Sequence, residues 1–185
     1  MESSIPTENY FSRYIETPRL YLREFTPDDL DELYHIYSDP QIMQYLTGVK
    51  TREATEIAIH TMLKRWEEHN FGMWAVVHKI DRKMIGRCGL GFLDKTPEVE
   101  LGYAFDKVYW NQGLATEASL ASLNYGFEIL KLERIVAIAR PENIASQRVI
   151  QKVGMKYEKN ARYYETDVIY YSISRETYES FDFRF

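Results

Sequence analysis

The pattern of apolar residues near the start of the chain predicts a strand followed by two helices. Apolar and polar residues alternate over residues 15–22, which is typical of a half-buried strand. Thr26 and Pro27 then suit the N-cap and the first position of a helix that ends at Asp39-Pro40. A second helix is predicted from about residue 51 to residue 69. The apolar positions are Leu30, Leu33, Tyr34 and Tyr37 in the first helix, and Ile59, Met62, Leu63 and Trp66 in the second.

From residue 72 the period changes to two and predicts a run of strands. Residues 73–78 and 83–93 are expected to form a hairpin across the polar connection 79–82, and residues 99–105 form the next strand. The chain then passes a glycine turn at residues 112–116 and enters a further helix. The apolar positions of that helix are Leu120, Leu123, Phe127 and Leu130.

The last third of the chain predicts a strand, a helix and a closing pair of strands. Residues 134–139 form the strand and residues 146–153 the helix, which Gly154-Met155 ends in the usual pattern of a helix C-terminus. The final two strands are linked near Thr166-Asp167. The order βααβββαβαββ indicates an α+β fold with a central mixed, mostly antiparallel β-sheet flanked by helices.

Length and composition favour one folded unit. A chain of 185 residues fits a single domain with a substantial core, so we expect a flexible segment over residues 1–13 and one domain over residues 14–185. The chain has 23 Lys and Arg against 28 Asp and Glu, a formal net charge of −5, and no basic run that would follow a phosphate backbone. Nucleic acid is therefore a poor candidate partner. The acidic excess suits a cationic partner, and it is also ordinary for a cytosolic protein.

The sequence shows neither a targeting signal nor a metal-binding motif. No apolar run approaches the length of a membrane span and the first residues lack a signal-peptide pattern, so we predict a cytoplasmic protein without membrane contact. The single cysteine, Cys88, excludes an internal disulfide, and its alternating strand pattern indicates a buried structural thiol. We expect no metal site, because none of the four histidines has the spacing of a metal-binding motif: His35, His60, His69 and His78.

The glycine turn is the clearest candidate for chemistry. A strand that enters a glycine turn and then a helix brings unpaired backbone N–H groups together at the positive end of the helix dipole. Gly113 and Ala115 leave room for an anion, so residues 112–116 suit a phosphate or pyrophosphate without any lysine. A purely structural turn is the alternative. Because the turn follows an antiparallel meander, a dinucleotide fold is not indicated.

Several ordered motifs make the sequence resemble a known family. They are Glu100-Leu101-Gly102-Tyr103, residues 110–118, Asn143 with Ser146, and residues 152–155. The segment from "ELGYAF" at Glu100 to "KVGMKY" at Tyr157 resembles the GNAT superfamily of acetyl-CoA-dependent N-acetyltransferases, within it the branch of Rim-type ribosomal-protein N-terminal acetyltransferases. The likeness extends over roughly residues 17–175. Trp110 departs from the Gln or Arg that the wider superfamily has before its first glycine, and the branch tolerates this replacement.

The resemblance implies where acetyl-CoA binds. The backbone of Tyr103 and Phe105 would pair with the pantetheine arm like an added strand, and a bulge near residues 100–102 would part their strand from its neighbour. Asn143 and Ser146 would contact the other side of the arm. The backbone N–H groups that would hold the CoA pyrophosphate belong to Gln112, Gly113, Leu114, Ala115 and Thr116.

The reaction requires a base and a proton donor. A carboxylate acting through water suffices for an amine, and we assign this role to Glu100, with Glu98 as second choice and a solvated strand position as the alternative. An N–H group near Gly102-Tyr103 would stabilise the oxyanion. Family members often place a thiolate-protonating tyrosine where this chain has Ile150, so Ser146 becomes the substitute donor; its alternative role is to cap the helix.

The acceptor is the open part of this interpretation. The resemblance favours a primary amine, either a protein N-terminal α-amine or a small molecule such as a polyamine, an aminoglycoside or an amino-acid derivative. A non-catalytic acyl-CoA-binding module and a purely structural interaction domain are the alternatives from other classes. Homodimers are common in the branch, so a homodimer is one expected assembly.

Overall fold

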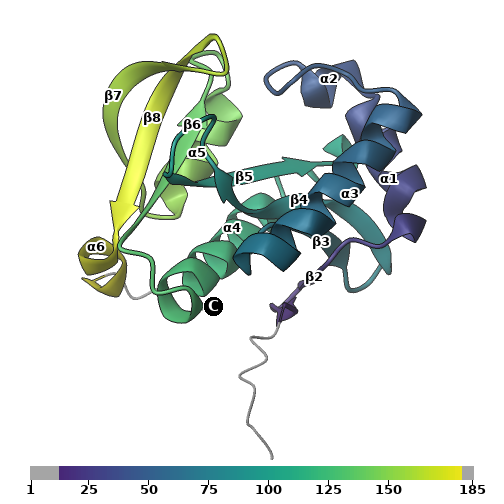
Figure 1. Cartoon of the computed structure of the whole chain (residues 1–185), viewed down its shortest axis with the longest axis horizontal. Helices are drawn as coiled ribbons and strands as arrows, with labels where there is room; N and C mark the ends of the chain where they lie inside the picture. Colours follow the sequence, from purple (N-terminus) through teal and green to yellow (C-terminus); the bar gives the residue numbers. More distant parts are fainter. Residues whose placement is uncertain (1–12, 181–185) are drawn as a thin grey trace, which may run out of the picture.

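The computed structural model describes residues 13–180, so the expected flexible segment at residues 1–13 lies almost wholly outside the described residues. Its centre is one mixed sheet with the strand order β1-β2-β3-β4-β5-β6-β8-β7 (Figure 1). Neighbouring strands are antiparallel except for β5 and β6. The predicted mixed, mostly antiparallel sheet is confirmed. The strands are β1 (Ile15–Glu16), β2 (Leu20–Arg23), β3 (Met73–His78), β4 (Lys83–Phe92), β5 (Val99–Phe105), β6 (Arg134–Ala139), β7 (Lys156–Tyr163) and β8 (Thr166–Ser174).

Helices cover both faces of the sheet (Figure 1). Residues of α1 and α3 pack with Ala75 and Ala104 on one face, while α4 packs with Leu90 and Cys88 on the other. The two faces therefore bury separate apolar clusters, as expected for strands whose side chains alternate. The helices are α1 (Leu30–Tyr37), α2 (Pro40–Met43), α3 (Arg52–His69), α4 (Leu114–Asn124), α5 (Ile144–Lys152) and α6 (Arg175–Ser180), with short turns η1 (Pro27–Asp29), η2 (Lys107–Tyr109) and η3 (Tyr125–Ile129).

Three local predictions differ from the structure near turns. Residues 15–22 form two short strands rather than one, because the chain turns at Thr17-Pro18 and Ile15 pairs with Leu22. Asp39-Pro40 ends α1 as predicted but also begins α2, since the Asp39 carboxylate caps it by accepting the Gln41 N–H at 2.8 Å. The turn between β7 and β8 lies at Tyr164-Glu165, both with positive φ, and not at Thr166-Asp167. Helix α6 was not predicted.

The face of α4 is built from small residues. Leu120 and Leu130 are only half-buried, whereas Ala118, Ser119, Ala121 and Ser122 are buried against the sheet. The Cys88 Sγ lies 3.4 Å from the Ser122 hydroxyl, and burial raises the pKa of the thiol to about 11. Cys88 is therefore the buried structural thiol that the sequence predicts.

The two halves of the sheet separate between β5 and β6. These parallel strands pair at one position, Glu100 with Val136, although β5 continues to Phe105. On its other edge β5 pairs with β4 without a register shift, from Val99 to Phe105. The bulge predicted near residues 100–102 is therefore wrong, and the opening arises because β6 turns away from β5.

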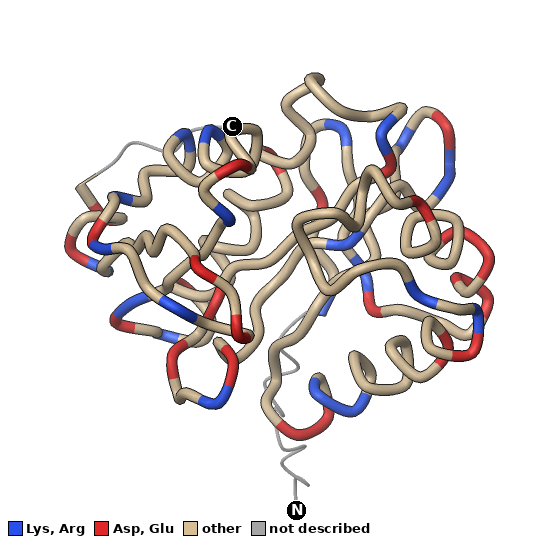
Figure 2. Tube along the Cα trace, turned by 90° about the horizontal axis from the view of Figure 1, so that it is seen from above, with Lys and Arg blue, Asp and Glu red and all other residues tan. Residues whose placement is uncertain are grey.

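Three further observations concern charge, hydropathy and metal ligands. Lys and Arg positions are interspersed with Asp and Glu positions through the fold (Figure 2). No helix among residues 13–180 is long and apolar enough to span a membrane. The same residues contain no group of three or more His, Cys, Asp and Glu placed to hold a metal ion.

Candidate active site

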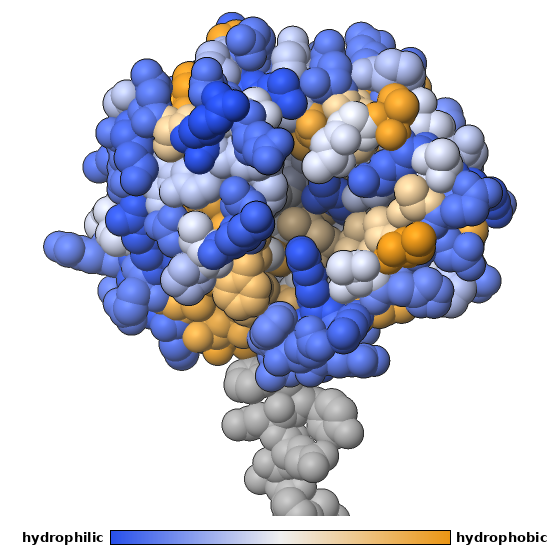
Figure 3. Space-filling model, turned by 45° about the horizontal axis from the view of Figure 1, so that its top comes forward, coloured by the Kyte–Doolittle hydropathy of each residue, from blue (hydrophilic) through white to orange (hydrophobic). Residues whose placement is uncertain are grey.

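A cavity of about 950 Å³ lies where β5 and β6 separate. Its walls come from α3 and the segment between α1 and α3, from β5 with Met73 and Arg87 of the neighbouring strands, from the β6–α5 connection and from the tip of the β7–β8 hairpin. A hollow is visible in the middle of the face shown in Figure 3. The cavity brings together four of the residues that the sequence singles out, namely Glu100, Tyr103, Asn143 and Ser146.

Successive residues of β5 point their backbone N–H and C=O groups alternately toward β4 and toward β6. The Asp106 N–H donates to the Ile85 carbonyl at 2.9 Å, so every second residue before it, Ala104 and Gly102, also points its backbone toward β4. The backbone groups of Tyr103 and Phe105 then point to the side from which β6 has departed. This is the orientation that an added, strand-like ligand requires.

The glycine turn lies beyond the far end of β5 and outside the cavity lining. Gly113 is the N-cap of α4 with φ 79°, and Asn111 also has positive φ at 60°. The first N–H that bonds back into the helix belongs to Glu117, which donates to the Gly113 carbonyl at 3.0 Å. Within the described chain, the N–H groups of residues 112–116 donate to no acceptor. The turn thus presents several unpaired donors at the positive end of a helix, which suits an anion.

Arg19 contacts this turn and holds it in place, a role that was not predicted from the sequence. Its Nη1 donates to the Gln112 carbonyl at 2.8 Å, and its Nη2 lies 3.5 Å from the position a Gly113 Cβ would take. Arg19 is held in turn by the buried Glu117, which accepts from its Nε at 2.7 Å. Burial opposes ionisation of Glu117, but hydrogen bonds from Thr17 and Arg19 outweigh it and lower the pKa. Sequence spacing does not connect Arg19 with Glu117, because the two residues are 98 positions apart and only the fold brings them together.

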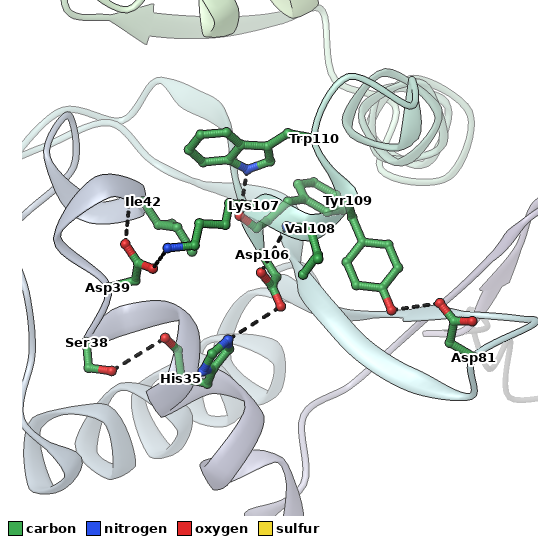
Figure 4. Close-up of polar contacts among 11 residues, drawn as sticks. His35, Ser38, Asp39, Ile42, Asp81, Asp106, Lys107, Val108, Tyr109 and Trp110 are labelled. Carbon is green, nitrogen blue, oxygen red and sulfur yellow. Dashed lines mark hydrogen bonds and ion pairs between the residues drawn. The ribbon is translucent and has the colours of Figure 1, made fainter.

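The segment before the turn is anchored at four points (Figure 4). Lys107 pairs with Asp39 at 2.6 Å, and Asp106 lies 3.6 Å from the His35 ring. The Tyr109 hydroxyl donates to Asp81. The Trp110 Nε1 donates to the Phe105 carbonyl at 2.9 Å. Trp110 therefore has a structural reason for replacing the family's polar residue, and it occupies one of the backbone groups predicted to pair with pantetheine.

Glu100 is half-buried in the cavity and is contacted by the tip of the β7–β8 hairpin. Burial raises the pKa of its carboxyl to about 7, although the Tyr164 hydroxyl, which donates to its Oε2 at 3.2 Å, and the charge of Arg87 oppose this. Tyr164 is held by Asp94, whose carboxylate accepts the Tyr164 N–H at 3.1 Å. Tyr170 and Tyr171 of β8 are buried, whereas Tyr164 at the hairpin tip is 48% exposed. Glu98 does not line the cavity, and its carboxylate accepts the Tyr170 hydroxyl.

Ser146 meets Tyr103 across the gap between β5 and α5. The Ser146 Oγ and the Tyr103 hydroxyl are 2.9 Å apart, and the phenol also reaches the Ser146 carbonyl at 3.0 Å. Asn143, not Ser146, caps α5, because its Oδ1 accepts the Ser146 N–H at 3.1 Å. The capping role predicted for Ser146 is therefore wrong, and its hydroxyl bonds to the Tyr103 hydroxyl instead. Burial raises the pKa of Tyr103, so the phenol stays protonated. Ile150 is buried beside them.

Comparisons with known proteins agree with this geometry. Residues 19–156 match the family model described as the acetyltransferase (GNAT) domain. The N-acetyltransferase YnaD of Bacillus subtilis, which is uncharacterized, is 34% identical over 78% of this chain and 84% of its own. A GNAT-family acetyltransferase from Bacillus anthracis has a TM-score of 0.78 and 30% identity, and the match covers 88% of this chain and 99% of that one.

The chain belongs to the GNAT acetyltransferases and is an acyltransferase of the N-acetyltransferase class. Enzymes of this family use acetyl-CoA as the acetyl donor. RimL, a ribosomal L7/L12 α-N-protein acetyltransferase solved with coenzyme A, has a TM-score of 0.75 over 87% of this chain and 97% of its own; at 17% identity this shows a shared fold.

The support from Arg19 gives a first prediction. Arg19→Gln removes a charged donor beneath the turn, so we expect the Kd for acetyl-CoA, measured by calorimetry, to rise about tenfold. Arg23→Gln is the matched control, because Arg23 pairs with Asp29 and contacts no residue of the turn. It should lower stability but leave the Kd unchanged. Equal Kd values for the Arg19 variant and the wild type would remove Arg19 from the site.

Proposed function

We propose that this protein transfers the acetyl group of acetyl-CoA to a primary amine by direct attack within a ternary complex. The observation that carries the proposal is the alignment of three features along β5: unpaired N–H groups at the start of α4, an open backbone edge at Tyr103 and Phe105, and Glu100 in the cavity. The N–H groups at the start of α4 suit the pyrophosphate, the open edge of β5 suits the pantetheine arm, and Glu100 suits the amine.

Glu100 would remove the proton from the incoming ammonium, directly or through one water. A pKa near 7 makes the carboxylate basic enough to accept this proton and still ionised in part at neutral pH. As the amine attacks, the thioester carbonyl becomes an oxyanion, which the N–H of Tyr103 can stabilise because it faces the gap.

Ser146 would supply the proton that the leaving thiolate takes up. Its Oγ is within hydrogen-bond distance of the Tyr103 phenol, so a proton lost from Ser146 can be replaced through that bond. Ser146 and Tyr103 line the same cavity as Ile150, which stands at the position where family members often have a tyrosine. The high pKa of Tyr103 limits it to passing a proton on rather than remaining ionised.

The sequence-level alternative of a non-catalytic acyl-CoA-binding module is less well supported by this arrangement. It rested on the missing tyrosine, and the Ser146–Tyr103 pair offers another donor. Either a protein N-terminal α-amine or a small amine is a candidate acceptor.

The first test is a CoA-release assay over N-terminal peptides and small amines. The wild type should release CoA with at least one acceptor. Gly113→Glu should abolish acetyl-CoA binding, because it adds a carboxylate at the mouth of the helix in a position with φ 79°. Gly113→Ala imposes a similar backbone strain without the charge, so it should weaken binding much less. Saturable acetyl-CoA binding without release for any acceptor would favour the non-catalytic module, and wild-type affinity in Gly113→Glu would remove the turn from the phosphate site.

The second test is the pH profile of turnover. We expect kcat/KM to rise with pH through about 7, the pKa of Glu100, because only the ionised carboxylate accepts a proton. Tyr164→Phe removes a hydrogen bond that favours the ionised form, so the pKa rises and the profile shifts to higher pH. Tyr157→Phe, on an exposed tyrosine of β7, should leave the profile unchanged. A Glu100→Gln variant that keeps the wild-type profile would exclude Glu100 as the base.

A further inference from the structure

The cavity that holds Glu100 is lined by cations, against the acidic balance of the whole chain. The basic residues in its lining are Lys50, Arg65, Arg87 and Arg140, whereas Glu100 is the one acidic side chain there. The chain as a whole carries a net charge of −5. A mild acidic excess suggested a cationic partner at the level of sequence, and the cavity has the opposite character.

None of these four cations forms an ion pair within the described residues, although the charge of Arg87 acts on Glu100. Within residues 13–180, the Lys and Arg side chains without an ion-pair partner are exposed, with three exceptions that are half-buried: Lys50, Arg87 and Arg140. All three exceptions line the cavity. A half-buried charge is costly without a partner, so a cluster of such charges favours an anion in the space they share.

Arg87 is the member whose geometry is best defined. Its Nε is buried and has no hydrogen-bond partner, and its Nη1 contacts only the Met73 sulfur, at 3.4 Å. The guanidinium stands 5.7 Å from the centre of the Tyr37 ring, and the Lys50 ammonium stands 6.0 Å from the same ring. Neither a thioether nor an aromatic ring neutralises the charge. Arg87 interacts electrostatically with Glu100, but it forms no hydrogen bond or ion pair with a carboxylate of the described residues.

Arg87 and Arg65 flank Glu100 on one face of the sheet. The Arg87 Nη1 lies 3.8 Å from the position a Gly102 Cβ would take, and Gly102 is two residues from Glu100 on the same strand face. The Arg65 Nη1 lies 3.6 Å from the corresponding position at Gly91, the direct cross-strand partner of Glu100. The Met73 side chain lies over these two glycines, with its Cε 3.1 Å from the Gly102 position and 3.8 Å from the Gly91 position. Both guanidinium groups and Glu100 line the same cavity, so a ligand bound there lies close to all three charges.

The pyrophosphate of CoA does not account for these charges. Its proposed site is the start of α4, beyond Phe105, whereas Arg65 and Arg87 lie over the other half of β5. They stand on the side of the amine acceptor.

We infer that the acceptor is an amine that also carries a carboxylate, which binds Arg87 and Arg65 while the amine faces Glu100. This inference rests on the proposed function and narrows it. Guanidinium groups bind carboxylates through paired, charge-assisted hydrogen bonds, and such binding would place the nitrogen beside the base. The same chemistry occurs in a free amino-acid-like molecule and in a peptide with an acidic residue near its N-terminus. Polyamines and aminoglycosides, which are polycations, are repelled.

The test compares acceptors that differ only in the carboxylate. Ser-Asp and Ser-Asn peptides of four residues represent the polypeptide source, and a short ω-amino acid with its primary amide represents the small-molecule source. Spermidine is the polycation. In one of the two pairs, the wild type should show a kcat/KM about tenfold higher for the carboxylate member. The pair that responds identifies the source.

Arg87→Gln should reduce this ratio to near one while the KM for acetyl-CoA stays unchanged. Lys83→Gln, an exposed position on the same strand, is the control and should keep the ratio. The inference is overturned if carboxylate and amide acceptors react equally in both pairs, if spermidine reacts best, or if the ratio survives in Arg87→Gln. If neutral amines react without any preference, the inference fails while the proposed function stands.

A second readout keeps the inference testable if no acceptor turns over. Calorimetry can compare the binding of the acetylated carboxylate products and their amides to the CoA complex of wild type and Arg87→Gln. Preferential binding of the carboxylates, lost in the variant, supports the site. Equal binding of carboxylate and amide in the wild type overturns it.

Discussion

The organisation of this protein depends on the separation of β5 from β6. A backbone group buried without a partner costs about 1–3 kcal/mol, so a strand inside a sheet does not normally leave one edge open. Here the two strands pair at Glu100 and Val136, and the edge of β5 then stays open through Phe105. The gap creates the cavity and orients alternate backbone groups toward it. A strand-like ligand that fills the gap can gain bonds to the N–H groups of Tyr103 and Phe105 without first breaking any, whereas the Phe105 carbonyl already accepts from Trp110.

The rest of the site is arranged along the same strand. At one end, Arg19 and the network around residues 106–110 hold the turn that begins α4, so its N–H groups stay unpaired and fixed. At the other end, Glu100 is half-buried beside unpaired cations, and the hairpin tip with Tyr164 covers it. A single open strand thus connects a site suited to a diphosphate with a site suited to an amine. Backbone dipoles supply the positive charge of the diphosphate site, and side-chain cations border the amine site.

Much of this arrangement could be predicted from the sequence, and the failures have physical reasons. The periods of two and of 3.6 residues placed the meander and α3, and the glycine turn located the start of α4. Turns were misplaced where local capping overrode the pattern: Asp39 both ends one helix and starts another, and Tyr164-Glu165 adopt positive φ without glycine. Contacts between residues that are far apart in the chain could not be predicted from the sequence. Neither the link of Arg19 to Glu117 nor that of Tyr103 to Ser146 follows from spacing, and the cations of the cavity are far apart in the chain.

The central claim is that the open edge of β5 receives the pantetheine arm, and amide hydrogen exchange followed by NMR tests it most directly. The N–H groups of Gly102 and Ala104 face β4 and are paired already, whereas those of Tyr103 and Phe105 face the gap. On addition of acetyl-CoA, exchange at Tyr103 and Phe105 should slow while exchange at Gly102 and Ala104 changes little. Saturation with acetyl-CoA that leaves exchange at Tyr103 and Phe105 unchanged would contradict the account.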